Sequence, residues 1–367
     1  MKEIRRIVEL YGQLKNEAVP SALAVVVDVA ESSYRRIGAR LLVASDGRYM
    51  GGISGGCLEG DALRRARTAI LSNQPTVHTY DTRDGEDAVI GVGLGCEGRI
   101  DVLFLPLDYG DQNNEVELLS RFADTRAPVL LLRSLQTHQQ RPVEPRLMTT
   151  DRLDPLGRLT GQSTADLRSR AEEVLAGGRS RRITVTGERE YPFPVLCEIL
   201  QPEIHLIVTG TNYDIPPTLL AARHLGWRTT LVGARRKFTT EMQRLADRLV
   251  DYSDITSVAT DAATAVVMMS HDYDWDLRMV RHFLPQHPAY LGLLGPRKRT
   301  VKLAEQLQAE NGPDLLGYPN LFAPVGLDVG AETPEEIATS LTAEIIAVFR
   351  SRNGGYLRER ATPIHER

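Results

Sequence analysis

The sequence predicts an α/β protein with an N-terminal α+β domain around a mixed sheet and a C-terminal Rossmann-like domain around a doubly wound parallel sheet. Two observations support this prediction. In the first half, the apolar run at 22–29 is followed by two segments joined at Asp46-Gly47, a dipeptide typical of hairpin turns. From residue 204 onward, continuous apolar runs alternate with helical patterns, as they do where parallel strands are covered on both faces.

The chain has 367 residues, more than one hydrophobic core usually supports, so we expect two domains. The first spans 1–200, with a core at 20–107 and an extension at 108–200. The second spans 201–367 and ends in a tail at 351–367.

Hydrophobic periodicity and helix start and stop signals predict the individual elements. In the first domain we expect an amphipathic helix at 1–17, strands at 22–29, 39–45 and 48–54, a helix at 63–71, strands at 77–81, 99–107 and 127–135, a helix at 164–178 and a strand at 181–187. The proline-bearing stretch 191–203 is interpreted as a linker. In the second domain we expect strands at 204–210, 228–234, 264–270 and 289–295, helices at 217–226 and 274–284, and a last helix opened by a capping box at Thr333-Pro334-Glu335-Glu336.

Composition narrows the functional classes. A net charge of −4 without a basic block argues against a nucleic-acid surface, and no apolar run reaches the roughly 18 residues of a membrane span. The three cysteines, Cys57, Cys96 and Cys197, form no disulfide framework. We therefore expect a cytoplasmic protein.

The stretch SGGCLEGD, which begins at Ser54, is the first candidate site. A turn at Gly55 and Gly56 exposes backbone N–H groups, and the start of a helix adds positive potential, so an oxyanion would be favoured there. If Cys57 begins that helix, the same potential favours its thiolate, which can ligate a soft metal. A tight turn with a small buried cysteine is the alternative.

Two further segments could join this site. The glycine-rich stretch GVGLGCEG carries Cys96, and the two cysteine loops could face each other; a transient disulfide between them is a further alternative, while zinc is disfavoured by the cysteine spacing. Arg35, Arg36 and Arg40 lie upstream, and arginine side chains match phosphates in a bidentate manner. A solvated basic loop would explain the arginines equally well.

A possible nucleotide or second site lies in the Rossmann half. The expected G-x-G-x-x-G reads Gly210-Thr211-Asn212-Tyr213-Asp214-Ile215, so only the first glycine of the pattern is present. The second strand ends at Gly233 without the acid that binds a ribose hydroxyl, and Arg235 and Arg236 follow it, which would suit a 2′-phosphate. NAD(P) binding is therefore an alternative that the arginines favour and the incomplete glycine pattern disfavours.

Polar residues also follow the later strands of this half. Ser270, His271 and Asp272 come at the carboxyl end of the strand expected at 264–270, where open α/β sheets bind ligands. His271 could exchange protons, although capping the next helix is an alternative use of these three residues. Arg297, in GPRKR, could contact a phosphate or simply begin a helix.

Several long segments occur together in one order: SSYRRIGAR, DGRYMGGISGGCLEG, GLGCEG, MSHDYDWDL, YLGLLGPRKR, GLDVGAETPEEIA and GGYLRERATPIH. In this combination, which extends across almost the whole chain, the sequence resembles the XdhC/CoxI family, the accessory proteins of xanthine dehydrogenase and related molybdenum hydroxylases. The cysteines of that family's SGGC and GLGC motifs fall on Cys57 and Cys96.

The resemblance implies a homodimeric, cytoplasmic chaperone rather than a turnover enzyme. Such a protein binds molybdenum cofactor, protects it, brings it to a cysteine desulfurase for sulfuration and inserts it into an apo-hydroxylase. Cys57 would contact the molybdenum, Ser54, Gly55 and Gly56 would supply donors, and Cys96 would line the same cleft. Arg35, Arg36 and Arg40 would steer the anionic pterin.

The sequence departs from the family pattern at Glu31, Tyr34 and Ile37, which replace a glycine and two prolines, and at Glu97, which replaces a glycine. The GAG of the Rossmann turn is also absent. Two alternatives remain: an NAD(P)-dependent oxidoreductase that uses His271 as its acid or base, and a cofactor-free scaffold of the maturation complex.

Overall fold

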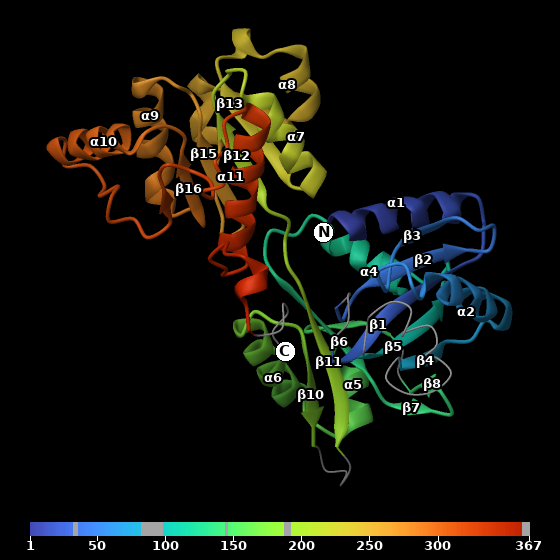
Figure 1. Cartoon of the computed structure of the whole chain (residues 1–367). Helices are drawn as coiled ribbons and strands as arrows, with labels where there is room; N and C mark the ends of the chain where they lie inside the picture. The colour runs from blue at the N-terminus through green and yellow to red at the C-terminus, as the bar shows by residue number, and fades with distance from the viewer. Residues whose placement is uncertain (32–35, 82–97, 144–145, 187–191, 362–367) are drawn as a thin grey trace. The chain divides into compact units, whose positions relative to one another are not determined.

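The computed structural model describes residues 1–31, 36–81, 98–143, 146–186 and 192–361. It contains two compact units, Met1–Gln201 and Pro202–Arg367 (Figure 1). Each unit has its own sheets and cores, so the two are described in turn. No helix in the described part of the chain combines the length and the apolar character that crossing a membrane requires.

Unit 1 is built first around a five-stranded sheet of order β3-β2-β1-β5-β4, whose described pairings are all antiparallel. Its strands are β1 (Ser21–Glu31), β2 (Arg40–Ala44), β3 (Tyr49–Gly51), β4 (Thr76–Asp81) and β5 (Gly98–Pro106). Asp46 and Gly47 join β2 to β3, which confirms the predicted hairpin.

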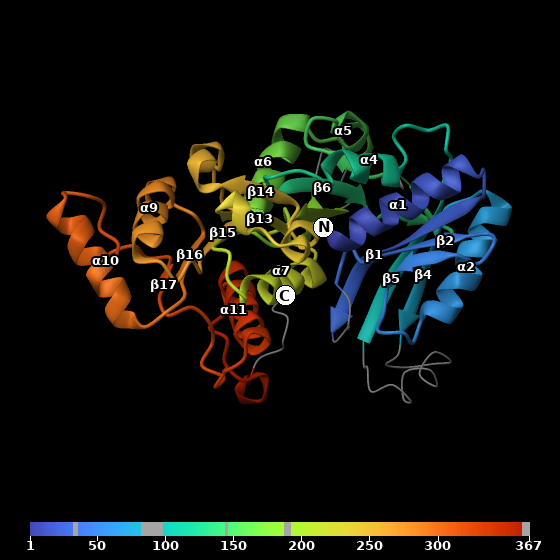
Figure 2. The same cartoon turned by 90° about the horizontal axis from the view of Figure 1, so that it is seen from above.

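Helices cover both faces of this sheet (Figure 2). Alternate residues of β1 point to opposite faces, as the period of a strand requires. Ala22, Ala24 and Val26 pack with α2 (Glu59–Ser72), while Leu23 and Val25 pack with α1 (Lys2–Asn16). The predicted N-terminal helix is therefore confirmed, and its apolar stripe covers the sheet.

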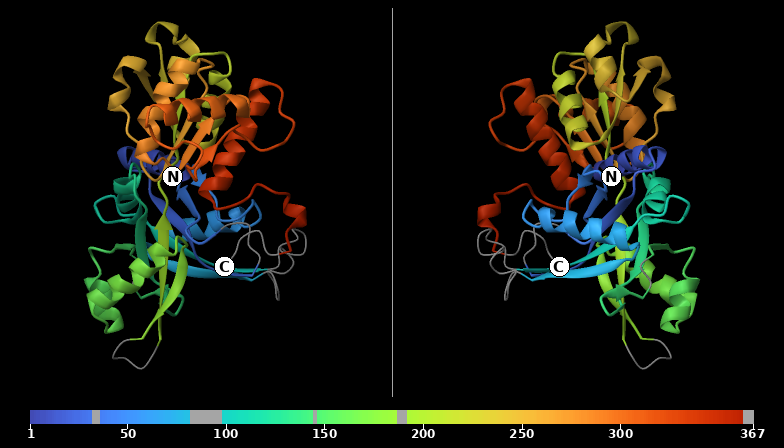
Figure 3. Two further views of the ribbon diagram at one scale, coloured as in Figure 1. Left: turned by 90° about the vertical axis from the view of Figure 1, so that its left-hand side faces the viewer. Right: turned by 90° about the vertical axis from the view of Figure 1, so that its right-hand side faces the viewer.

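A second, four-stranded sheet of order β10-β11-β6-β9 completes unit 1. It contains β6 (Val129–Ser134), β9 (Met148–Thr149), β10 (Arg181–Val185) and β11 (Phe193–Leu200), and the cluster that fills one of its faces includes residues of α5 (Asp154–Thr160) and α6 (Thr164–Ala176) (Figure 3). The remaining elements are α4 (Glu115–Phe122) and a short hairpin of β7 (Thr137–His138) and β8 (Arg141–Pro142).

The linker prediction at 191–203 was wrong. Residues 193–200 form β11, an interior strand paired with β6 and β10, and Cys197 is fully buried in it. Pro194 is the second residue of the strand, so it does not interrupt the six residues that follow. The prolines mark the start of a strand and not a flexible connection.

Unit 2 has a six-stranded sheet of order β14-β13-β12-β15-β16-β17, with every described pairing parallel. Numbered along the chain, this is the order 3-2-1-4-5-6 of dinucleotide-binding Rossmann sheets. The strands are β12 (His205–Thr209), β13 (Arg228–Gly233), β14 (Arg248–Asp251), β15 (Thr264–Met268), β16 (Tyr290–Leu293) and β17 (Leu321–Phe322). The predicted doubly wound parallel fold is confirmed.

Helices lie on both sides of these strands, and two separate cores fill the two interfaces (Figure 1). One core includes residues of α9 (Tyr273–Phe283) and α10 (Arg297–Ala309), and the other includes residues of α7 (Ile215–Leu225), α8 (Thr240–Leu245) and α11 (Pro334–Phe349). The capping box predicted at Thr333 and Glu336 opens α11. Short 3-10 turns are η1 (Arg235–Lys237), η2 (Tyr252–Ser257), η3 (Leu284–Gln286) and η4 (Leu357–Glu359).

Candidate functional site

The turn at 54–58 connects β3 to α2, and Cys57 lies in it. The helix begins at Glu59 with Leu58 as its N-cap, so Cys57 precedes the helix instead of beginning it. Gly55 and Gly56 are exposed, Cys57 is half-buried, and Cys57 packs at the edge of the α2 core. The thiol therefore occupies the border between that core and solvent.

Two side chains of the stretch itself bind most of the turn's backbone donors. Glu59 accepts hydrogen bonds from the N–H of Ser54 (2.9 Å), the N–H of Ile53 (3.2 Å) and the Ser54 hydroxyl. The Ser54 Oγ in turn accepts from the N–H of Leu58 (3.0 Å) and the N–H of Gly56 (3.2 Å). This arrangement holds the turn in one conformation before any ligand arrives.

The expected anion site is consequently smaller than the sequence suggested. The N–H groups of Ser54 and Gly56 have partners, whereas for those of Gly55 and Cys57 no partner is found among the described residues. Burial raises the pKa of Glu59, but its bonds to the Ser54 hydroxyl and to nearby N–H groups outweigh burial and lower the pKa below its usual value. A carboxylate charge thus lies within the turn, and among the described groups a ligand here can use the two remaining donors and the sulfur.

The strand ends that flank the second cysteine segment lie beside α2. Asp61, four residues after Cys57, accepts a hydrogen bond of 2.7 Å from the Tyr80 hydroxyl, one residue before β4 ends. Strand β5 begins at Gly98, paired with Glu31 at the end of β1. The connections that contain Arg35 and Cys96 therefore start and finish at the end of the sheet where α2 begins. Arg35, Cys96 and the departures at Tyr34 and Glu97 lie outside the described residues.

Arg40 is buried and holds the fold of unit 1. Its guanidinium pairs with both carboxylate oxygens of Glu198 at 2.7 Å and with Glu115 at 3.1 Å, and Glu115 also pairs with Arg133. Burial opposes the charge of Arg40, but the two carboxylates outweigh it and raise its pKa. Only 2% of the Arg40 side chain is exposed, so the predicted role of Arg40 in steering an anionic ligand was wrong. Arg36 is exposed, just before the turn into β2.

In unit 2, the crevice between β12 and β15 is closed by the protein's own groups. Gly210 has φ +135°, and a Cβ on it would lie 2.5 Å from the Met269 carbonyl oxygen. The Asn212 amide donates to the carbonyls of Ser270 (2.9 Å) and Met269 (3.2 Å). Asn212 thereby links the loops that follow the two strands at the switch point of the sheet.

The start of α7 is unsuited to a pyrophosphate. Dinucleotides place this group on the N–H donors of the helix that follows the first strand. Here Pro216 and Pro217 remove two of those donors, and the N-cap residue is Asp214, whose buried side chain makes no capping hydrogen bond to the helix. Asp214 Oδ2 lies 2.6 Å from His271 Nε2, while Asp214 Oδ1 has no hydrogen-bond partner within the described chain.

The other polar residues of this edge have structural partners. Asp272 caps α9, accepting from the N–H groups of Asp274 and Trp275, as the capping alternative expected. Ser270 donates to the buried Asp276, which also pairs with Arg299 at 2.6 Å. Arg297 is the exposed first residue of α10.

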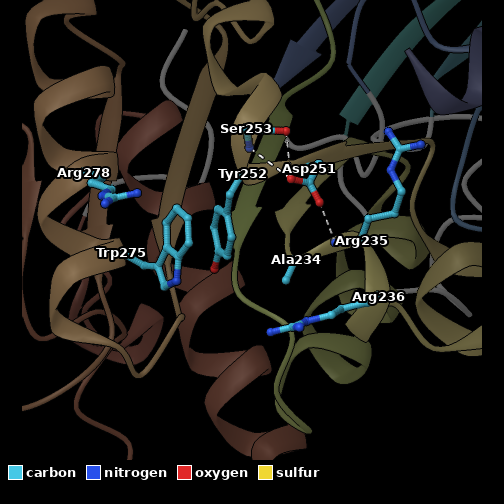
Figure 4. A pocket seen from close by; sticks show the side chains of 8 residues that line it. All are labelled: Ala234, Arg235, Arg236, Asp251, Tyr252, Ser253, Trp275 and Arg278. Atoms are coloured by element: carbon cyan, nitrogen blue, oxygen red, sulfur yellow. Dashed lines mark hydrogen bonds between the residues drawn. The ribbon is translucent and has the colours of Figure 1, made fainter.

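An open hollow lies at the carboxyl ends of β13 and β14. It is lined by Ala234, Arg235, Arg236, Asp251, Tyr252, Ser253, Trp275 and Arg278 (Figure 4). The sequence pointed to the two consecutive arginines only. Tyr252, Trp275 and Arg278 were missed because they belong to other elements, although the position of Tyr252 directly after a strand of the Rossmann half was a usable signal.

Metal ligation by the protein alone finds no support in the described residues, because they contain no group of three or more histidine, cysteine or carboxylate side chains able to hold an ion.

Comparison with known proteins gives consistent matches. A model described as "XdhC Rossmann domain" matches residues 206–345, and one described as "XdhC and CoxI family" matches residues 14–81. The chain is 27% identical over 333 residues to a Bacillus subtilis protein described as a probable xanthine dehydrogenase subunit, covering 89% of this chain and 92% of that protein. It is 22% identical over 332 residues to the Escherichia coli molybdenum cofactor insertion chaperone PaoD, covering 89% and 83%.

A solved structure described as a xanthine dehydrogenase from Bacillus halodurans superposes with a TM-score of 0.71 at 26% identity. The match covers 95% of this chain and 96% of the other. The similarity thus extends through both units.

Proposed function

This chain belongs to the XdhC and CoxI family, and from that premise we propose that it is a molybdenum-cofactor chaperone for a xanthine dehydrogenase-type hydroxylase. One relative is described as a molybdenum cofactor insertion chaperone, and another as part of a xanthine dehydrogenase. In this proposal the cofactor is cargo: it is bound, kept from oxidation and passed on.

The observation that carries the proposal is the half-buried Cys57 in a turn that is already held in place. Its sulfur is a soft, polarizable ligand suited to a molybdenum centre. The N–H groups of Gly55 and Cys57 can bind an oxo or phosphate oxygen beside it. Because Ser54 and Glu59 fix the turn through their own hydrogen bonds, binding would require little ordering of the backbone.

Other residues take supporting roles. Arg36, exposed before β2, would attract the anionic pterin, and Arg35 and Cys96 would act from the connections that leave the sheet beside α2. Ser54 would support the site indirectly, by holding the conformation of the turn, since its N–H and hydroxyl already donate to Glu59. We further propose that the chaperone works as a homodimer in the cytoplasm, brings its bound cofactor to a cysteine desulfurase for sulfuration and delivers it to the apo-hydroxylase.

The test compares Cys57→Ala with wild type after loading with molybdenum cofactor. We expect the variant to lose most of its bound molybdenum and pterin, and to activate an apo-hydroxylase more slowly. Cys197→Ala is the matched control, because Cys197 is buried in β11 and its thiol pKa is raised to about 12 by burial. Equal cofactor retention by Cys57→Ala and wild type would refute the role of Cys57.

The oxidoreductase alternative is weakened by the start of α7. His271 has a buried carboxylate partner, as an acid or base often does, but the helix start beside it lacks donors for a pyrophosphate. A cofactor-free scaffold remains distinguishable: it would copurify with desulfurase and hydroxylase while containing neither pterin nor molybdenum.

A further inference from the structure

The hollow at the carboxyl ends of β13 and β14 has no role in the function proposed above. It has a volume of about 700 Å³ and is open to solvent, and all its lining residues belong to unit 2. The hollow lies at the carboxyl edge of the sheet, the edge where α/β proteins bind ligands, and is one strand away from the switch point between β12 and β15.

Aromatic rings form one wall of the hollow. The rings of Tyr252 and Trp275 are stacked, with centroids 3.8 Å apart and planes 12° apart, and the Arg278 guanidinium lies 4.8 Å from the centroid of Trp275 (Figure 4). Tyr252 is only 8% exposed, so the stack is anchored in the core of the unit. Such a wall favours a flat ring that can stack on it.

Positive charge surrounds this wall. Arg235 and Arg236 follow β13 on the side of Tyr252 opposite to Trp275, and all three arginines of the lining are exposed (Figure 4). Among the described residues, the Arg235 guanidinium has one ion pair, a long and exposed one of 3.7 Å with Asp254. No ion pair of Arg236 or Arg278 is found within the described chain, so these two guanidinium groups are available to an oxyanion.

The one carboxylate of the lining is already engaged. Asp251 Oδ2 accepts from the N–H of Arg235 at 2.7 Å, and Oδ1 accepts from the N–H and the hydroxyl of Ser253, both at 3.0 Å. These hydrogen bonds lower the pKa of Asp251, the Ser253 N–H contributing most. Asp251 thus shapes the loops that present Arg235 and Tyr252.

We propose that this hollow binds a planar nitrogen heterocycle that carries a phosphate ester, with the ring against the Tyr252–Trp275 wall and the phosphate at Arg236. The ligand does not continue to α7, because Asp214, Pro216 and Pro217 exclude a pyrophosphate there. Two sources share this chemistry: a nucleotide, and the phosphorylated pterin of the proposed cargo.

Trp275 provides a direct readout. The chain has two tryptophans, so a Trp227→Phe background leaves Trp275 as the single reporter. Titration of this protein with AMP should quench its fluorescence, with an affinity at least tenfold higher than that of adenosine or of inorganic phosphate. Equal binding of phosphate alone, or absence of any binding by AMP, GMP and CMP, would overturn the proposal.

Variants locate the phosphate contact. Arg236→Ala should weaken AMP binding about tenfold, the scale of one lost charge-assisted contact. Lys298→Ala, which removes an exposed positive charge of α10 outside the hollow, should leave it unchanged. An equal loss of AMP affinity in both variants would mean that the loss comes from the lower net positive charge of the protein. That result would refute a specific phosphate site at Arg236.

Two comparisons separate the possible sources. NADP and NAD should bind no more tightly than the corresponding mononucleotide. An affinity more than tenfold higher would contradict the conclusion that a pyrophosphate is excluded at the start of α7. AMP is then titrated into apo protein and into protein loaded with molybdenum cofactor. Unchanged affinity assigns the hollow to a nucleotide, whereas competition assigns it to the pterin phosphate. The Cys57→Ala variant should bind AMP normally, so failure of the chaperone proposal leaves this test intact.

Discussion

The two units each contain a glycine turn that joins a strand to a helix, and the two turns differ in what they leave open. Between β3 and α2, Glu59 and Ser54 bind several donors of the turn, and within the described chain the N–H groups of Gly55 and Cys57 stay unpaired beside a thiol. Between β12 and α7, Asp214 and two prolines remove the anion-binding capacity of the helix start.

The difference shows that a glycine turn before a helix is not by itself an anion site. Each turn contains a carboxylate of the chain, Glu59 as the acceptor of turn donors in unit 1 and Asp214 as the N-cap residue of α7 in unit 2. In unit 1 this carboxylate organises a turn that still presents a sulfur and two donors. In unit 2 it is paired with His271, and the ligand surface lies farther along the sheet edge, after β13 and β14.

The largest expected loss of stability comes from removing the residue that supports the turn between β3 and α2. Gly52 donates its N–H to the Arg40 carbonyl at 2.8 Å, so the turn rests on the residue whose side chain lies in the buried ion pairs. Arg40→Met should lower the free energy of unfolding of unit 1 by about 3–5 kcal/mol, because it leaves Glu198 buried without its partner. Hydrogen exchange of the β2 amides measures this loss.

Arg48→Ala is the matched control for that variant. Arg48 pairs with Asp46 and Glu17 at the exposed hairpin, where solvent screens the charges and an ion pair contributes little to stability. If Arg40→Met cost no more than Arg48→Ala, the structural role of Arg40 would be wrong and a ligand role would become tenable again.

The next largest loss of stability is expected when a glycine of either turn is replaced by alanine, and the two turns should differ in its size. Gly210 and Gly56 both have positive φ, +135° and +114°, but only Gly210 lies against backbone, since a Cβ at Gly56 meets nothing within 4 Å. Gly210→Ala should cost about 3 kcal/mol or more, and Gly56→Ala only about 1–2 kcal/mol of conformational strain. Urea unfolding followed by tryptophan fluorescence reports unit 2, and hydrogen exchange reports unit 1. Equal costs would show that the second crevice is not closed.

The smallest effect concerns Glu59. Glu59→Gln should destabilise unit 1 by about 1 kcal/mol near pH 7, because weaker neutral bonds replace those of the carboxylate. The pKa of Glu59 is lower in the folded protein than its usual 4.5, so its contribution is present above pH 4.5 and is lost as pH falls through the folded pKa. The difference between wild type and variant should therefore shrink on acidification, and a difference that grows would contradict the hydrogen-bonding scheme.

Local signals in the sequence predicted much of the fold. The Asp46-Gly47 hairpin, the capping box at Thr333 and the apolar parallel strands are each specified by residues a few positions apart. The interior strand β11 escaped prediction because two prolines stand at its start, and its pairing partner β6 lies far away in the chain.

The site was predicted less completely, for a related reason. Arg40 has the same local appearance as Arg36, yet its carboxylate partners lie 75 and 158 residues away. Likewise, Trp275 and Tyr252 come together only through folding of separate elements. Cys57 could be identified from the residues of its turn. That Ser54 and Glu59 bind the donors of this turn depends on the folded conformation, which the residue types alone do not specify.

The buried ion pairs around Arg40 also set a limit on the modularity of unit 1. Arg40 comes from β2, Glu115 from α4, Arg133 from β6 and Glu198 from β11, so a fragment ending near residue 107 would carry Arg40 without either acid. The family-matched segment at 14–81 is accordingly a stretch of sequence similarity and not a separable module. A truncated or fused form of this protein that keeps unit 1 folded must therefore contain the chain up to about residue 201.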